Sequence, residues 1–153
     1  MSVLVVGIGH PFRRDDAVGW RVAQVLTERL TAAGRADVTI LQHHGEGTDL
    51  MARWQGFDRV VLVDATSSGS VPGSLRYWDE PGLVPKECFP KSSHVFGLAE
   101  ALSLAADLGR LPSCLRVVGI EGADFSAGDA LDPRVEATIE IAVNLALNFI
   151  GAE

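Results

Sequence analysis

The sequence predicts an α/β fold: a three-layer α/β/α sandwich around a five-stranded, mostly parallel twisted sheet with one antiparallel edge strand. Short apolar runs alternate with stretches of helical periodicity, which is typical of βαβ units. Residues 58–65 contain a continuous apolar run, as expected of a central parallel strand buried on both faces. Residues 74–79 follow that strand with no room for a crossover helix, so we expect them to pair antiparallel at an edge.

The remaining elements follow in order along the chain. Strands are predicted over residues 3–6, 38–41, 58–65, 74–79 and 114–120. Helices are predicted to begin at Asp15, Thr48, His94 and Pro133. The spacing of the last helix gives it a core face of Val135, Ile139, Ala142, Val143, Ala146 and Ile150.

Right-handed crossovers place the carboxyl ends of the four parallel strands on one rim of the sheet. These ends are Gly7, Leu41, Val63 and Ile120. Ligands of open α/β sheets bind outside the carboxyl ends of the strands. A proline-punctuated loop over residues 80–93 shows no periodicity, and a loop of that length in a compact domain is usually functional.

Composition narrows the class of protein. The 153 residues, 47% of them hydrophobic, suffice for one domain over residues 1–153. The net charge of −7 argues against nucleic acid as a partner. No apolar run approaches the roughly 20 residues of a membrane span, and the N-terminus leads directly into a predicted strand rather than a signal peptide. Two cysteines, Cys88 and Cys114, in no metal-like spacing fit a cytoplasmic protein with reduced thiols.

Three potential metal ligands fall on the predicted rim. Asp16 lies in the first turn after the first strand, beside Asp15, which suits the N-cap of the helix. Asp64 ends the central strand and His94 opens a helix. Two carboxylates and an imidazole can hold a borderline divalent ion such as Zn²⁺ or Ni²⁺. Each residue also has an ordinary explanation: a surface acid at a helix start, a turn-forming acid and a helix-start histidine.

Four segments resemble the hydrogenase maturation proteases in order and spacing. GIGHPFRRDDAVG is similar to the N-terminal pattern of that family, G-x-G-N-x-L-x-x-D-[DE]-x-x-G. VVLVDATSSGSVPG and SSHVFGLAEAL resemble its strand-end aspartate and its S-x-H-x-x-G-L segment. VVGIEGADFSAGDALDPRVEATI is similar to the last strand and the approach to the C-terminal helix. The resemblance therefore runs nearly from end to end.

The resemblance implies a phosphorylase/hydrolase-like fold and a cytoplasmic endopeptidase. Such enzymes remove the C-terminal extension of a [NiFe] hydrogenase large-subunit precursor once nickel is in place. The family's nickel-recognising residues fall on Asp16, Asp64 and His94, which are also the expected catalytic residues. The nickel is carried by the substrate, and other divalent metals such as Zn or Cd are expected to occupy the same site. The ion either serves recognition alone or also polarises the scissile carbonyl and activates water, with a carboxylate as base.

The chain departs from the family pattern on the same rim. His10 replaces the usual asparagine, and residues 42–48 replace an acidic-Gly-Gly-Thr pattern. His10, His43 and His44 are either additional ligands or acid/base groups, or exposed loop residues. A non-cleaving, nickel-dependent binding or chaperone protein for a hydrogenase-like partner is therefore the alternative function. A dinucleotide site is not expected, because Phe12 occupies the place of the third glycine of that fingerprint.

Overall fold

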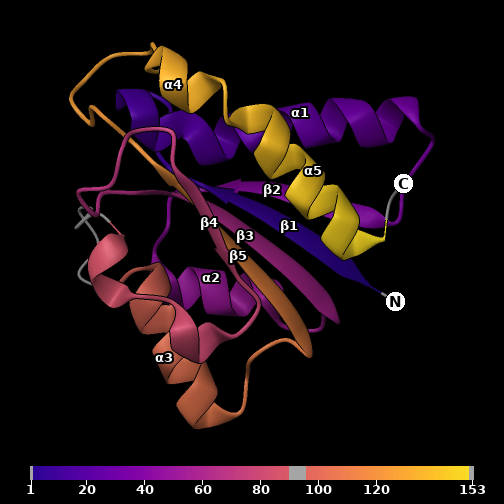
Figure 1. Ribbon diagram of the computed structural model, residues 1–153. Helices are drawn as coiled ribbons and strands as arrows, with labels where there is room; N and C mark the ends of the chain where they lie inside the picture. Colours follow the sequence, from indigo (N-terminus) through magenta and orange to yellow (C-terminus); the bar gives the residue numbers. More distant parts are fainter. Residues whose placement is uncertain (1, 90–95, 152–153) are drawn as a thin grey trace.

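The computed structural model describes residues 2–89 and 96–151 of the protein. They form one five-stranded sheet in the order β2-β1-β3-β5-β4 (Figure 1). The strands are β1 (Val3–Ile8), β2 (Val38–His43), β3 (Arg59–Thr66), β4 (Leu75–Trp78) and β5 (Cys114–Glu121). β1 pairs in parallel with β2 and β3, and β3 pairs in parallel with β5. β4 pairs antiparallel with β5 at the edge, which confirms the predicted sheet.

Helices cover both faces of this sheet, as predicted. The helices are α1 (Val18–Ala32), α2 (Gly47–Trp54), α3 (Leu98–Leu108), α4 (Pro133–Glu136) and α5 (Ile139–Ile150). Figure 1 shows α1, α4 and α5 on one side of the sheet and α2 and α3 on the other. Alternate residues of each strand point to opposite faces. Accordingly, Val61 packs into the core under α1 and α5, while Leu62 packs into the core with α2 and α3.

The tightest contact between the layers lies where α1 crosses the first strand. A β-carbon added to Gly7 would lie 2.1 Å from the carbonyl oxygen of Gly19, and one added to Gly19 would lie 2.3 Å from that of Ile8. Only glycine permits two backbones to approach so closely. The two glycines therefore seat the start of α1 directly on the end of β1.

The strand bounds differ from the predicted ranges by one or two residues, and four features of the helices and loops differ more. A 3-10 helix, η1 (Arg14–Ala17), precedes α1, so the first helix does not begin at Asp15 as an α-helix. α2 is capped by Glu46 rather than Thr48, because the Glu46 carboxylate accepts hydrogen bonds from the backbone N–H groups of Thr48 and Asp49. The predicted C-terminal helix is divided at residues 137–138 into α4 and α5.

The fourth difference concerns the segment between β4 and α3. α3 begins at Leu98, not at His94, and His94 itself lies outside the described residues. The predicted loop contains two 3-10 helices, η2 (Pro81–Leu83) and η3 (Lys86–Cys88). No helix within the described part of the chain is long and apolar enough to cross a membrane.

Candidate active site

The carboxyl ends of β1, β2, β3 and β5 meet at one rim, and Asp16 and Asp64 lie there. The parallel register pairs Gly7 with both Gln42 of β2 and Val63 of β3. Asp64 is the next residue of β3 and pairs with Gly119 of β5. Asp16 lies in η1, directly after the turn that leaves β1. The predicted common rim is confirmed, and two of the three predicted ligands come from it.

The Asp64 carboxyl is poorly solvated and senses a second negative charge. Asp64 is 8% exposed, and burial raises the pKa of its carboxyl well above the ordinary value. The charge of Asp16 raises this pKa further, and a 2.8 Å hydrogen bond from the N–H of Ala65 opposes the increase. Electrostatic coupling of this kind requires the two carboxyls to be near each other. In agreement with this, η1, which carries Asp16, contacts β3, which carries Asp64.

Asp16 is the more readily ionised member of the pair. Partial burial raises its pKa, while the electrostatic effects of Arg13 and His10 lower it. The negative charge of Asp16 opposes the ionisation of Asp64 and so contributes to its raised pKa. Two carboxyls arranged in this way resist carrying two negative charges unless a cation neutralises them.

The third predicted ligand, His94, lies outside the described residues. Phe96, two positions further along, accepts a 2.8 Å hydrogen bond from the N–H of Gly47 at the start of α2. The chain therefore passes close to the start of α2 before α3 begins. Within residues 2–89 and 96–151, no three histidine, cysteine or acidic side chains form a metal-binding group. The assignment of His94 stays a prediction.

Asp15 does not cap a helix, contrary to the prediction. It is fully buried, and its carboxylate accepts three backbone hydrogen bonds from residues more than 100 positions away in the sequence. The donors are the N–H groups of Ala123 at 2.7 Å, Asp124 at 3.0 Å and Asp132 at 2.8 Å. Asp15 therefore ties the loop after β1 to the loop after β5.

Glu121 is a rim residue that the sequence reasoning missed. It ends β5, is 3% exposed, and accepts hydrogen bonds from the side chains of Thr66 and Ser68 at 2.8 and 2.7 Å. The backbone N–H of Ser68 donates a further bond of 2.8 Å. An acid at the end of an apolar strand was the available signal, and it is the same signal that marked Asp64.

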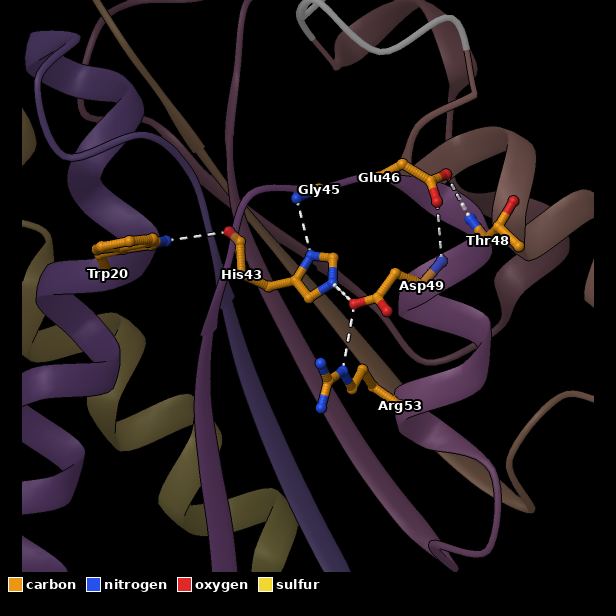
Figure 2. A network of polar contacts seen from close by, with 7 residues as sticks. All are labelled: Trp20, His43, Gly45, Glu46, Thr48, Asp49 and Arg53. Atoms are coloured by element: carbon orange, nitrogen blue, oxygen red, sulfur yellow. Dashed lines mark hydrogen bonds and ion pairs between the residues drawn. The ribbon is translucent and has the colours of Figure 1, made fainter.

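The three rim histidines have different environments. Both ring nitrogens of His43 are engaged: Nδ1 accepts from the N–H of Gly45 at 2.8 Å, and Nε2 lies 2.6 Å from Asp49 Oδ2 (Figure 2). Since Nδ1 accepts, Nε2 is the nitrogen that donates to Asp49. Arg53 also donates to this Asp49 oxygen, which closes the network drawn in Figure 2. His43 therefore anchors the loop before α2, and its ring has no nitrogen left for a metal.

His10 and His44 instead belong to an aromatic cluster beside Asp16. The ring centroids of His10 and His44 lie 5.9 Å apart, and His44 lies 5.2 Å from Trp20. Phe12, whose ring lies 6.2 Å from that of His10, is 68% exposed. The N–H of His10 donates to the carbonyl of Asp16, so these rings lie on the rim beside the Asp16 segment.

The fold and the rim define an α/β protein whose polar site lies at the carboxyl ends of its parallel strands. A family model described as hydrogenase maturation protease matches residues 20–149. The chain belongs to the hydrogenase maturation proteases and is an endopeptidase of that family. The matched range includes Asp64. It begins at Trp20 and therefore does not include Asp16.

Individual relatives extend the similarity through the Asp16 loop. The hydrogenase 2 maturation protease of Escherichia coli (strain K12) is 31% identical over 151 residues, covering 96% of this chain and 89% of the relative. The solved structure of the hydrogenase maturating endopeptidase HybD from E. coli has a TM-score of 0.79 at 28% identity, covering 97% of this chain and 91% of that one. A solution structure of an endopeptidase from E. coli has a TM-score of 0.82 at 29% identity, with coverage of 100% and 96%.

Proposed function

We propose that this endopeptidase removes the C-terminal extension of a [NiFe] hydrogenase large-subunit precursor after nickel insertion. We further propose that Asp16, Asp64 and His94 recognise the nickel that the precursor carries. Membership of the hydrogenase maturation proteases supports the substrate class. The single observation that most supports the metal-facing role is that η1, which carries Asp16, contacts β3, which carries Asp64, at the carboxyl ends of the strands.

The chemistry of the two carboxyls fits a divalent cation. Both have raised pKa values because burial disfavours their charged forms, and each would become easier to ionise beside a cation. Neither is neutralised by an ion pair: among the described residues no arginine, lysine or histidine lies within salt-bridge distance of Asp16 or Asp64. An imidazole from His94 would complete a donor set that suits Ni²⁺ or Zn²⁺.

The same two acids are suited to different parts of peptide hydrolysis. Asp16 ionises more readily and is the better electrostatic partner for a cation held by the substrate. Asp64 holds its proton to higher pH and is suited to exchange a proton with the attacking water or the departing amine. Nickel bound by the precursor would place the scissile segment against this pair, which couples cleavage to nickel insertion.

Metal binding by the isolated enzyme tests the recognition site. We expect Asp16→Ala, Asp64→Ala and His94→Ala each to weaken Cd²⁺ binding, measured by calorimetry, without loss of the folded circular dichroism spectrum. Asp107→Ala is the matched control, because Asp107 is an exposed acid on α3. If all three site variants bound Cd²⁺ like the wild type, the shared site would be excluded.

Incubation with a nickel-loaded precursor separates the protease from a non-cleaving carrier. The protease releases the extension, which mass spectrometry of the precursor detects as a loss at its C-terminus. A carrier would instead remain in a stable complex with an intact precursor on size-exclusion chromatography.

A further inference from the structure

Four acids lie on the rim, and they divide into two kinds. The carboxylates of Asp15 and Glu121 are buried and each accepts three hydrogen bonds. Among the described residues, the Asp64 carboxyl accepts only the N–H of Ala65, and the Asp16 carboxyl has no hydrogen-bond donor. The Asp16 carboxyl is therefore not oriented by hydrogen bonds of its own, and the Asp64 carboxyl is held by one bond only. Their positions depend on the backbone that carries them.

The backbone beside Asp16 is held in an unfavourable conformation. Arg14 has φ of 46°, and it is the only non-glycine residue with positive φ within the described ranges. L-residues reach this region only at a cost in free energy, so surrounding contacts must maintain it. Those contacts come from the loop after β5: Arg14 N–H donates to the carbonyl of Gly128, and Gly128 N–H donates to the carbonyl of Phe12.

Asp15 makes the central link between these two loops. Its carboxylate accepts from Ala123, Asp124 and Asp132, and its own N–H donates to the Asp124 carbonyl at 3.0 Å. The bonds hold both ends of the segment 123–132 against the loop of residues 10–16. A carboxylate with two oxygens can satisfy three converging N–H groups, whereas an amide has a single acceptor oxygen.

We propose that Asp15 is a positioning residue of the active site: it fixes the loop after β5 against η1 and thereby fixes the direction in which Asp16 faces the metal. Asp15 is fully buried, so it does not itself contact the substrate. In metal sites, residues that hydrogen-bond to the ligands orient those ligands, and loss of such a residue typically weakens metal affinity 10–100-fold. Asp15 has a comparable role, exerted through the backbone that carries Asp16. This inference rests on the proposed metal-facing role of Asp16.

Two substitutions of Asp15 give a graded test. Asp15→Asn keeps one acceptor oxygen, while Asp15→Ala removes all three bonds and is the variant more prone to misfold. We expect Asp15→Asn to bind Cd²⁺ roughly 10–100-fold more weakly than the wild type in calorimetry. In metal-free protein we expect faster hydrogen exchange at the Asp16 amide, which otherwise donates to the Arg13 carbonyl at 3.0 Å.

Leu30→Ala is the control for a general loss of stability. Leu30 is 4% exposed and lies near the C-terminal end of α1. The loop that carries Asp15 and Asp16 joins the opposite, N-terminal end of this helix. The Leu30→Ala substitution should destabilise the domain. It should leave the Cd²⁺ affinity and the hydrogen-exchange rate of the Asp16 amide in the native state near their wild-type values. Equal weakening of Cd²⁺ binding by Leu30→Ala and Asp15→Asn would overturn the positioning role, as would wild-type affinity and exchange in Asp15→Asn.

The same measurements distinguish a failure of the proposed metal-binding role of Asp16 from a failure of the positioning role of Asp15. If the wild type and Asp16→Ala both failed to bind Cd²⁺, the metal-facing role of Asp16 would be excluded. The exchange rate of the Asp16 amide in metal-free Asp15→Asn would then still decide whether Asp15 holds this segment in place.

Discussion

A β-carbon on Gly9 would lie 2.0 Å from the carbonyl oxygen of Asp16. The backbone of the loop after β1 therefore folds directly onto itself, and the N–H of His10 donates to the same carbonyl at 3.2 Å. The second glycine of the N-terminal pattern is needed for this close approach rather than for binding phosphate. It returns the chain to the strand end and places Asp16 on the rim.

Gly9→Ala should displace the Asp16 segment. The added methyl group meets backbone rather than a flexible side chain, so the loop must shift, at a cost of about 1–3 kcal/mol in the free energy of unfolding. We expect weaker Cd²⁺ binding together with a lower urea midpoint. Gly82→Ala is the control, because a β-carbon there meets nothing within 4 Å. Unchanged Cd²⁺ affinity in Gly9→Ala would contradict this explanation of the glycine.

Glu121→Gln should destabilise the rim without adding a cavity. The glutamine amide retains one acceptor oxygen, whereas Thr66 and Ser68 supply three donors. Its NH₂ group would face the donors that the oxygen does not reach. Hydrogen bonds to charged groups each contribute about 1.5–3 kcal/mol, so we expect a loss of about that size or more in urea unfolding. Glu136→Gln removes only an exposed pair with Arg21 and should change stability by less than about 1 kcal/mol. Similar losses in the two variants would show that burial of Glu121 has no special effect.

Asp64→Asn should make the protein more stable at neutral pH. Burial and Asp16 raise the pKa of Asp64 in the folded state, so the folded state binds this proton more tightly than the unfolded chain does. This contribution to stability is complete below the unfolded-chain pKa of about 3.9 and is lost as pH rises towards the folded-state pKa. Removing the charge therefore raises Tm at pH 7 and changes it little near pH 4. An equal change in Tm at both pH values would contradict the proposed cause.

The sequence predicted the architecture because burial follows a simple alternation. The apolar run in β3 is buried on both faces, and the short interval before β4 allowed only an antiparallel edge. The core face predicted for the C-terminal helices, from Val135 to Ile150, is buried throughout. These features depend on residues close together in the sequence, so local periodicity is enough to find them.

The site was only partly predictable because its supporting contacts join distant segments. The partners of Asp15 lie 108 to 117 positions away, and no local pattern distinguishes such an acid from an N-cap. Glu46 rather than Thr48 caps α2, since both residue types can accept from a helix start and the choice depends on the loop anchored by His43. The placement of Asp16 and Asp64 on one rim, by contrast, followed from strand topology alone.

Cleavage of one precursor in two metal states tests the central proposal most directly. The wild-type enzyme is incubated with a [NiFe] hydrogenase large-subunit precursor that is either nickel-loaded or nickel-free, and the precursor mass is measured over time. We predict that the C-terminal extension is lost only from the nickel-loaded precursor, and that Asp16→Ala and Asp64→Ala abolish this loss. Equal cleavage of both precursors, or unchanged cleavage by the two variants, would contradict nickel recognition by the carboxylate pair.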